Sequence, residues 1–112
     1  MEIKNAIITK TFLGNRDGWF SFVLYFESDG VGGGFGTFAL DTYDPASNQR
    51  VFTPQSMEII SKILDVIGVS SWEELKGQYF RFRYDGMSKP VKRIGNIIKD
   101  KWFDVDEFYK KG

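Results

Sequence analysis

The 112-residue sequence contains no cysteine and no histidine. Without cysteine the chain has no disulfide and no thiolate nucleophile. Without histidine it lacks the commonest general base near neutral pH and the commonest protein ligand of zinc. Serine-hydrolase triads, cysteine-protease pairs and His-ligated metal sites are therefore excluded. We expect a protein that acts by binding rather than as an enzyme, with no cofactor, no metal and no catalytic residue.

The chain also lacks an excess of charge of one sign and lacks long hydrophobic runs. Fifteen basic and fifteen acidic side chains cancel, so the overall charge does not by itself indicate a nucleic-acid or membrane partner. No stretch approaches the roughly 20 apolar residues of a membrane span. The first five residues, Met-Glu-Ile-Lys-Asn, do not have the basic-then-apolar order of a signal peptide. We expect a single domain over residues 1–112, in the cytoplasm.

Aromatic residues, in contrast, are abundant, at 17% of the chain with 11 Phe. Several segments alternate aromatic or β-branched residues with polar ones, and a period of two is typical of strands. The clearest alternation places Phe20, Phe22, Leu24 and Phe26 on one side of a strand. The pattern predicts strands at residues 2–13, 19–27, 35–41, 78–84 and 91–99.

The main helix is expected between the third and fourth strands. Thr53 fits an N-cap, Pro54 the first helical position and Gly68 the position just after the helix. Between them, one apolar stripe recurs with helical spacing. This stripe consists of Met57, Ile60, Ile63, Leu64 and Ile67.

A second, short helix follows, because Ser71 and Glu74 fit a capping box and Gly77 provides a stop. Residues 42–52 are polar and irregular, and they are interpreted as a mobile excursion. The resulting order, βββααββ, predicts an α+β fold with a strongly curved antiparallel sheet of about five strands, which could form a partial barrel, and with one main helix and one short helix. The predicted core is Phe20, Phe22, Leu24, Phe26, Phe38, Leu40, Ile60, Ile63, Leu64, Ile67, Phe80, Phe82, Ile94 and Ile98.

A glycine-rich stretch between residues 30 and 36 is the first candidate binding element, and it is expected to be a loop. Glycines allow positive φ and close approach of the backbone to a ligand, and successive amides can form an anion-binding nest. A strand follows the stretch and no Gly-Lys-Ser/Thr motif is present, so it is neither a Rossmann fingerprint nor a P-loop. A flexible hairpin loop with a bulge is the alternative interpretation.

The second candidate is the basic segment 76–101, in which Tyr79, Arg81 and Arg83 share one face of a strand. Cations interleaved with aromatics are typical of surfaces that hold single-stranded nucleic acid. The alternative is a solvated face of a hairpin.

The C-terminal segment is acidic and aromatic. Asp100, Asp104, Asp106 and Glu107 could bind Mg²⁺ or Ca²⁺. Their spacing does not match an EF-hand loop, and the aromatic residues between them indicate an extended or single-turn segment packed on the sheet. No metal site is therefore predicted.

Three segments resemble a group of small uncharacterised proteins encoded by bacteriophages and prophages. They are Gly33-Gly34-Phe35-Gly36 leading into Ala39-Leu40-Asp41, the segment 69–77 (VSSWEELKG), and the segment 94–104 (IGNIIKDKWFD). The resemblance extends from the second strand to Phe103, and residues 42–52 are less typical of the group. It implies a phage early or accessory protein in the host cytoplasm, and it carries no established activity.

The leading hypothesis is a non-enzymatic phage protein that inhibits bacterial defence by binding a host protein or a small nucleotide signal. In the nucleotide version, backbone amides of the glycine stretch meet phosphates, Arg81, Arg83 or Lys99 neutralises charge, and Tyr79 or Trp102 stacks on a base. The predicted ligand-binding residues are Gly32, Gly33, Gly34, Phe35, Gly36, Tyr79, Arg81, Arg83, Lys99 and Trp102.

Two other functions stay open. One is an OB-like barrel that binds single-stranded DNA or RNA, with Tyr79, Arg81, Arg83, Lys92 and Arg93 on its binding face. The other is a structural or assembly protein of the virion that forms a homo-oligomer through an exposed strand edge.

Overall fold

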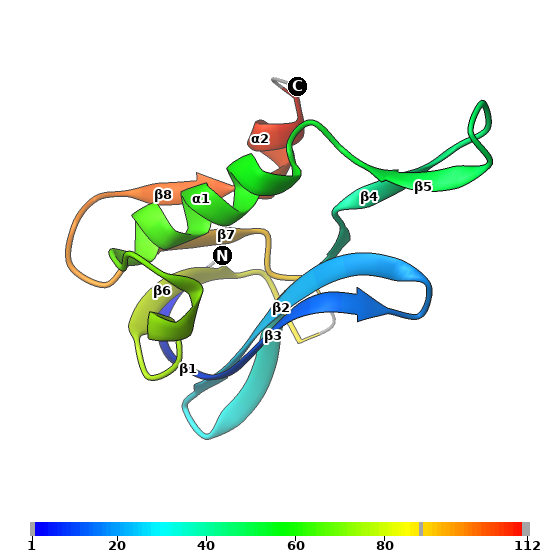
Figure 1. The fold of residues 1–112 in the computed structure, drawn as a ribbon. Coiled ribbons are helices and arrows are strands. Elements are labelled where there is room, and N and C mark those ends of the chain that lie inside the picture. The colour runs from blue at the N-terminus through cyan, green and yellow to red at the C-terminus, as the bar shows by residue number, and fades with distance from the viewer. Residues whose placement is uncertain (1, 88, 111–112) are drawn as a thin grey trace.

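The computed structural model describes residues 2–87 and 89–110, with the side chains of Thr37 and Phe38 left out of the description. These residues form two antiparallel sheets, two α-helices and one 3₁₀ turn (Figure 1). The larger sheet has the order β3-β2-β1-β6-β7-β8 and is not closed, so β3 and β8 are its edges. Its strands are β1 (Glu2–Arg16), β2 (Trp19–Ser28), β3 (Val31–Ala39), β6 (Tyr79–Tyr84), β7 (Arg93–Asn96) and β8 (Trp102–Asp104).

The expected α+β class and the curved antiparallel sheet are confirmed, but the number of strands and their order are corrected. The polar segment 42–52 is not an irregular excursion, because it forms the small second sheet from β4 (Asp41–Asp44) and β5 (Gln49–Phe52). Arg50 donates a 2.9 Å hydrogen bond to the Asp41 carboxylate at the base of this hairpin. That hydrogen bond holds the pKa of the Asp41 carboxyl below its usual range.

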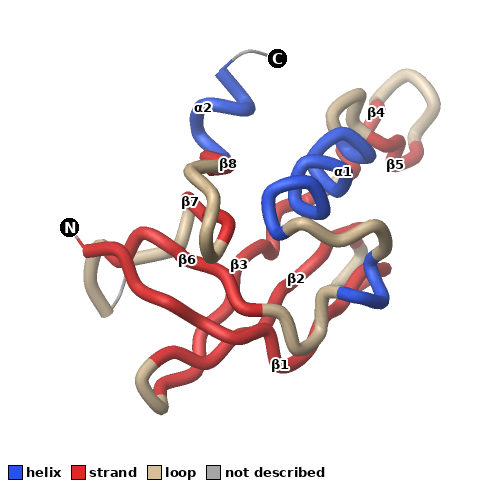
Figure 2. Tube along the Cα trace, turned by 90° about the vertical axis from the view of Figure 1, so that its left-hand side faces the viewer, coloured by secondary structure: helices blue, strands red, loops and turns tan. Residues whose placement is uncertain are grey.

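Strand β1 lies between β2 and β6 in the large sheet and pairs with both of them. Its first half, Glu2–Ile7, pairs with β6, and its second half pairs with β2. The register shifts between Ile8 and Lys10, and such a bulge bends a strand and increases its twist. Figure 2 shows the resulting curved sheet with α1 above it.

The main helix, α1 (Ser56–Ile67), covers the inner face of the sheet beside β7 and β8 (Figure 1). The helix begins later than predicted, so Thr53 is not its N-cap. The Thr53 N–H instead bonds to the Leu40 carbonyl at 3.0 Å, which places Thr53 at the end of the β4–β5 hairpin. Gly68 does end the helix, with φ of 93° and its N–H bonded to the Leu64 carbonyl.

The remaining elements are short. A 3₁₀ turn, η1 (Trp72–Glu74), replaces the second predicted helix, and the Ser71 hydroxyl bonds to the Glu74 carboxylate. The predicted return strand 91–99 is shortened to β7, and the C-terminal segment forms β8 and α2 (Val105–Lys110). Both parts of that segment pack on the body, since Phe103 and Val105 are buried.

The core lies between α1 and the inner face of the sheet. Most predicted core residues are buried, whereas Phe20 and Leu64 are only partly buried. Ile98 was predicted wrongly, because β7 ends at Asn96 and Ile98 is 85% exposed in the following loop. The prediction for Phe38 falls outside the described side chains. The buried residues that the periodicity did not indicate are Ala6, Ile8, Val23, Phe35, Ile59, Val66, Leu75, Phe103 and Val105.

Candidate functional site

The outer face of the large sheet carries a group of aromatic and basic side chains on β1 and β2. Directly opposed residues of two strands share one face, and the register pairs Lys10 with Tyr25 and Arg16 with Trp19. Phe12, opposite Val23, lies on the same face. Val23 is only 2% exposed although it faces away from the core, so this side of the sheet is packed as well. We call Lys10, Phe12, Arg16, Trp19 and Tyr25 the β1–β2 patch.

Cations contact two of the three rings of the patch, those of Phe12 and Tyr25. The Arg16 guanidinium lies 4.2 Å from the centre of the Phe12 ring and donates a 3.0 Å hydrogen bond to the Tyr25 hydroxyl. The Lys10 ammonium lies 5.7 Å from the centre of the Tyr25 ring. Within the described part of the chain, neither cation has a carboxylate within 4.0 Å. The patch therefore combines ordered rings with positive charge that no acidic side chain neutralises.

The glycine-rich stretch borders this patch, but it is not a loop. It forms the edge strand β3, and the turn that precedes it is confined to Asp29 and Gly30. A glycine has no side chain with which to display a period of two, so the strand pattern was hidden in the sequence. Pairing with β2 places Gly34 opposite Tyr25 and Gly32 opposite Glu27. No side chain of β3 therefore stands beside Tyr25.

The glycines of β3 differ in how much space surrounds them. A Cβ at Gly33 would lie 2.7 Å from the Phe26 ring, and one at Gly36 would lie 2.4 Å from the Phe22 carbonyl oxygen. A Cβ at Gly34 would meet only Val23, at 3.5 Å, and one at Gly32 would have its nearest neighbour at 3.9 Å. Packing therefore requires glycine at positions 33 and 36 but not at positions 32 and 34. We call the open strip formed by Gly32 and Gly34 the glycine shelf.

Predicted basic and aromatic residues of β6, β7 and β8 form a second cluster. The Arg81 and Arg93 guanidiniums lie 4.7 Å and 4.9 Å from the centre of the Trp102 ring. Arg81 also donates to the carbonyls of Asn96 and Lys99, at 2.6 Å and 2.8 Å. Trp102 rests against Gly95, where an added Cβ would lie 2.4 Å from the ring. The donors of Arg81 and the ring of Trp102 are therefore already engaged within the fold.

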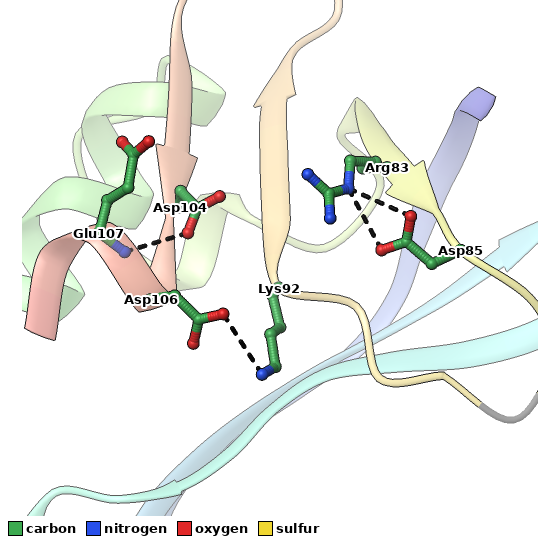
Figure 3. Close-up of polar contacts among 6 residues, drawn as sticks. All are labelled: Arg83, Asp85, Lys92, Asp104, Asp106 and Glu107. Atoms are coloured by element: carbon green, nitrogen blue, oxygen red, sulfur yellow. Dashed lines mark hydrogen bonds and ion pairs between the residues drawn. The ribbon is translucent and has the colours of Figure 1, made fainter. Parts of the chain in front are cut away.

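Two other cations of this region are paired with carboxylates (Figure 3). Arg83 forms an ion pair with Asp85 at 3.2 Å, and Lys92 pairs with Asp106 at 3.3 Å. The Asp104 carboxylate accepts a 3.1 Å hydrogen bond from the Glu107 N–H at the start of α2. Tyr79 remains 58% exposed. Among the described residues, no group of three or more acidic side chains is arranged to hold a metal ion.

The predicted ligand site is therefore divided between two parts of the sheet. Gly32 to Gly36 lie on β3, whereas Tyr79, Arg81 and Arg83 lie on β6, and β2 and β1 separate these strands. Arg81 and Trp102 do come together, and Lys99 joins them through its carbonyl group.

Sequence reasoning missed the β1–β2 patch, although a signal was present. Lys10, Phe12, Gly14 and Arg16 continue the period of two beyond the predicted end of the first strand at residue 13. Taking Arg16 as part of a strand would have placed these side chains on one face.

Comparisons of the chain with protein-family models, with curated proteins and with solved structures gave no match. In the described part of the chain, none of the helices has the length and apolar character needed to traverse a lipid bilayer. The geometry of the residues themselves is what bears on function.

Proposed function

We propose that the protein binds single-stranded nucleic acid on the outer face of β1, β2 and β3. The observation that carries the proposal is the β1–β2 patch, in which Trp19 is 45% exposed opposite Arg16, and neither Arg16 nor Lys10 has a carboxylate partner among the described residues. Proteins that bind single strands combine a basic track for the phosphates with aromatic rings on which bases stack.

Each part of the surface suits one part of the ligand. Lys10 and Arg16 supply charge for backbone phosphates, and Arg binds phosphate with a fork of N–H donors. Trp19 and Tyr25 supply the rings. The glycine shelf leaves space beside Tyr25 for a planar base to lie on the sheet. A base must be unpaired to enter such a site, so a single strand fits better than a duplex.

The connectivity of the sheet supports the same function. Three sequential antiparallel strands, a helix and a further hairpin whose first strand pairs with β1 are the arrangement expected of an OB-like domain. OB-folds bind oligonucleotides mainly on the face of their second and third strands. The sheet differs in that β7 pairs with β8 instead of closing onto β3.

The sequence predicted a nucleic-acid surface in the segment 76–101, whereas the proposed binding face lies on the neighbouring strands β1, β2 and β3 of the same sheet. Arg81 donates to two backbone carbonyls, and Arg83 forms an ion pair with Asp85. Arg16 has no carboxylate partner among the described residues. Tyr79, opposite Ile7, extends the outer face beyond β1. The nucleotide-signal hypothesis has less support, since its glycine and arginine components are separated.

We also propose a general biological role for this binding, namely phage takeover of the host. The resemblance to small phage proteins supports it, and single-stranded nucleic acid is present during phage replication and host defence. Action in the host cytoplasm and inhibition of a defence system follow as expectations from that resemblance.

The proposal is tested by fluorescence anisotropy with a labelled oligothymidylate of about 15 nucleotides at low salt. We expect binding that weakens with salt, with a log–log slope of about −0.7 per phosphate contacted. Arg16→Glu and Trp19→Ala should each weaken binding about tenfold, because one phosphate contact or one stacked base is lost.

The matched control is Lys62→Glu, which makes the same charge change at an exposed position of α1. It should leave the affinity within about twofold, because distant surface charges are screened. Absence of any anisotropy change at low salt would refute the proposal. Equal weakening by Lys62→Glu and Arg16→Glu would refute the assignment to this face.

A further inference from the structure

On the inner side of the sheet the β3 edge borders a hollow, whose wall shares Gly32 and Gly34 with the glycine shelf of the outer face. The hollow has a volume of about 430 Å³ and lies between β3 and the loop that joins β6 to β7. Its walls are mainly apolar, with Gly32 to Gly34 of β3 on one side. The apolar residues that line it include Phe26, Phe82, Tyr84, Met87 and Val91.

The strand beside this hollow has an unprotected edge. β3 ends the order of the large sheet, and Val31–Ala39 contains no charged residue and no proline. Proteins usually protect such edges with lysine, proline or a covering segment, because unpaired N–H and C=O groups recruit another strand. Glycine in a strand also permits close approach of a second backbone. The Val31–Gly34 part of the edge lacks these protecting residues and is also rich in glycine, so a second strand can approach it closely.

The rim of the hollow carries two lysines, Lys4 and Lys89, against one carboxylate, Asp29, so it is basic on balance. The Lys4 ammonium lies 4.3 Å from the centre of the Tyr84 ring. It also forms a long ion pair, at 3.9 Å, with the exposed Asp29 carboxylate. Lys89 has no carboxylate within 4.0 Å in the described part of the chain. Two exposed apolar residues, Val31 at 67% and Met87 at 95%, stand at the mouth of the hollow.

We infer that the β3 edge binds an extended peptide segment of a partner protein. The segment adds as a strand along Val31–Gly34, places apolar side chains in the hollow, and carries an acidic residue that meets Lys89. In this mode of recognition, main-chain hydrogen bonds supply affinity, and pockets for alternate side chains supply specificity. Apolar walls favour a peptide over a nucleic acid, and the basic rim favours an acidic peptide over a second copy of this neutral chain.

The experiment is selection from a displayed library of random peptides of about twelve residues, with counter-selection against the variant Met87→Asp. Met87 is almost fully exposed, so this variant should fold normally while placing a negative charge at the mouth. We expect selected peptides to alternate apolar and polar residues and to contain Asp or Glu. A synthetic selected peptide should shift the amide NMR signals of residues 31–34, 86, 87, 89 and 91.

Val31→Glu and Met87→Asp should each weaken binding of a selected peptide at least about fivefold, because each places a negative charge at the mouth of the hollow that repels the acidic peptide. Both variants should bind the oligonucleotide as the parent does, which separates this inference from the proposed function. A library that yields no peptide dependent on these two residues would overturn the inference. So would concentration-dependent dimerisation that protects the β3 amides, because the edge would then bind a second copy.

Discussion

At the scale of single residues, the glycines of β3 show how one residue type serves two purposes in adjacent positions. Gly33 faces the core, where the Phe26 ring occupies the space of a side chain. That ring packs 5.4 Å from Phe80 and 4.8 Å from Phe82, centre to centre, and it is 5% exposed. It therefore has little room to move. Gly34, on the opposite face, has no such neighbour.

Alanine substitutions separate these purposes. We expect Gly33→Ala to lower the free energy of unfolding by about 1–3 kcal/mol, because the new methyl group overpacks the core. Gly34→Ala should leave stability unchanged or raise it by about 0.5–1 kcal/mol, because glycine is unfavourable within a strand. Urea denaturation of the two variants measures both effects. A larger loss for Gly34→Ala than for Gly33→Ala would contradict the assignment of faces.

At the scale of elements, Asn96 joins helix α1 to the loop after β7. Its amide nitrogen donates to the carbonyls of Val66 and Ile67, at 3.0 Å and 3.4 Å. Its amide oxygen accepts from the N–H groups of Ile98 and Lys99, both at 2.9 Å. The Asn96 side chain thus pairs with carbonyls at the end of α1 and also holds the loop after β7. The Lys99 carbonyl of that loop accepts a hydrogen bond from Arg81.

This arrangement predicts a loss of stability on a nearly isosteric change. Asn96→Asp should cost about 2 kcal/mol at neutral pH, because a carboxylate cannot donate and is unfavourable at a helix C-terminus. Thermal denaturation of the variant and the parent at neutral pH measures this difference.

The exposed Asn15 provides a control, since Asn15→Asp makes the same chemical change away from a helix end. Equal losses of stability at both positions would show that the helix end is not the cause.

At the scale of the whole molecule, the β4–β5 hairpin extends from the body of the protein (Figure 1). Its attachments to the body lie at its base, where the Thr53 N–H bonds to the Leu40 carbonyl and Phe20 packs edge-on against Phe52 at 5.2 Å. Most of its side chains are exposed. Segments with few buried contacts open without unfolding of the whole molecule.

Amide hydrogen exchange should therefore divide the molecule into two parts. We expect the hairpin amides of residues 42–51 to exchange on the order of 100-fold faster than those in the paired centres of β1 and β2. Exchange followed by NMR provides the measurement, with the pairing of β1 and β6 as the internal reference. Equal protection of the hairpin and the large sheet would show that the two form one cooperative unit.

The sequence by itself determined the elements whose pattern is local. Alternation identified β2 and β6, helical spacing identified α1, and the absence of cysteine and histidine excluded whole classes of chemistry. These predictions succeed because side-chain direction repeats along a single strand or helix, without reference to distant residues. The start of α1 was missed, since Thr53 bonds to Leu40 across the hairpin.

The tertiary structure alone decided which residues share a surface. The pairing of Lys10 with Tyr25 depends on the register shift after Ile8, and the role of Gly34 depends on its position opposite Tyr25. Ile98 is apolar in sequence, yet it is exposed because β7 ends before it. Cross-strand register brings together residues that are far apart in the chain, and no local period encodes that pairing.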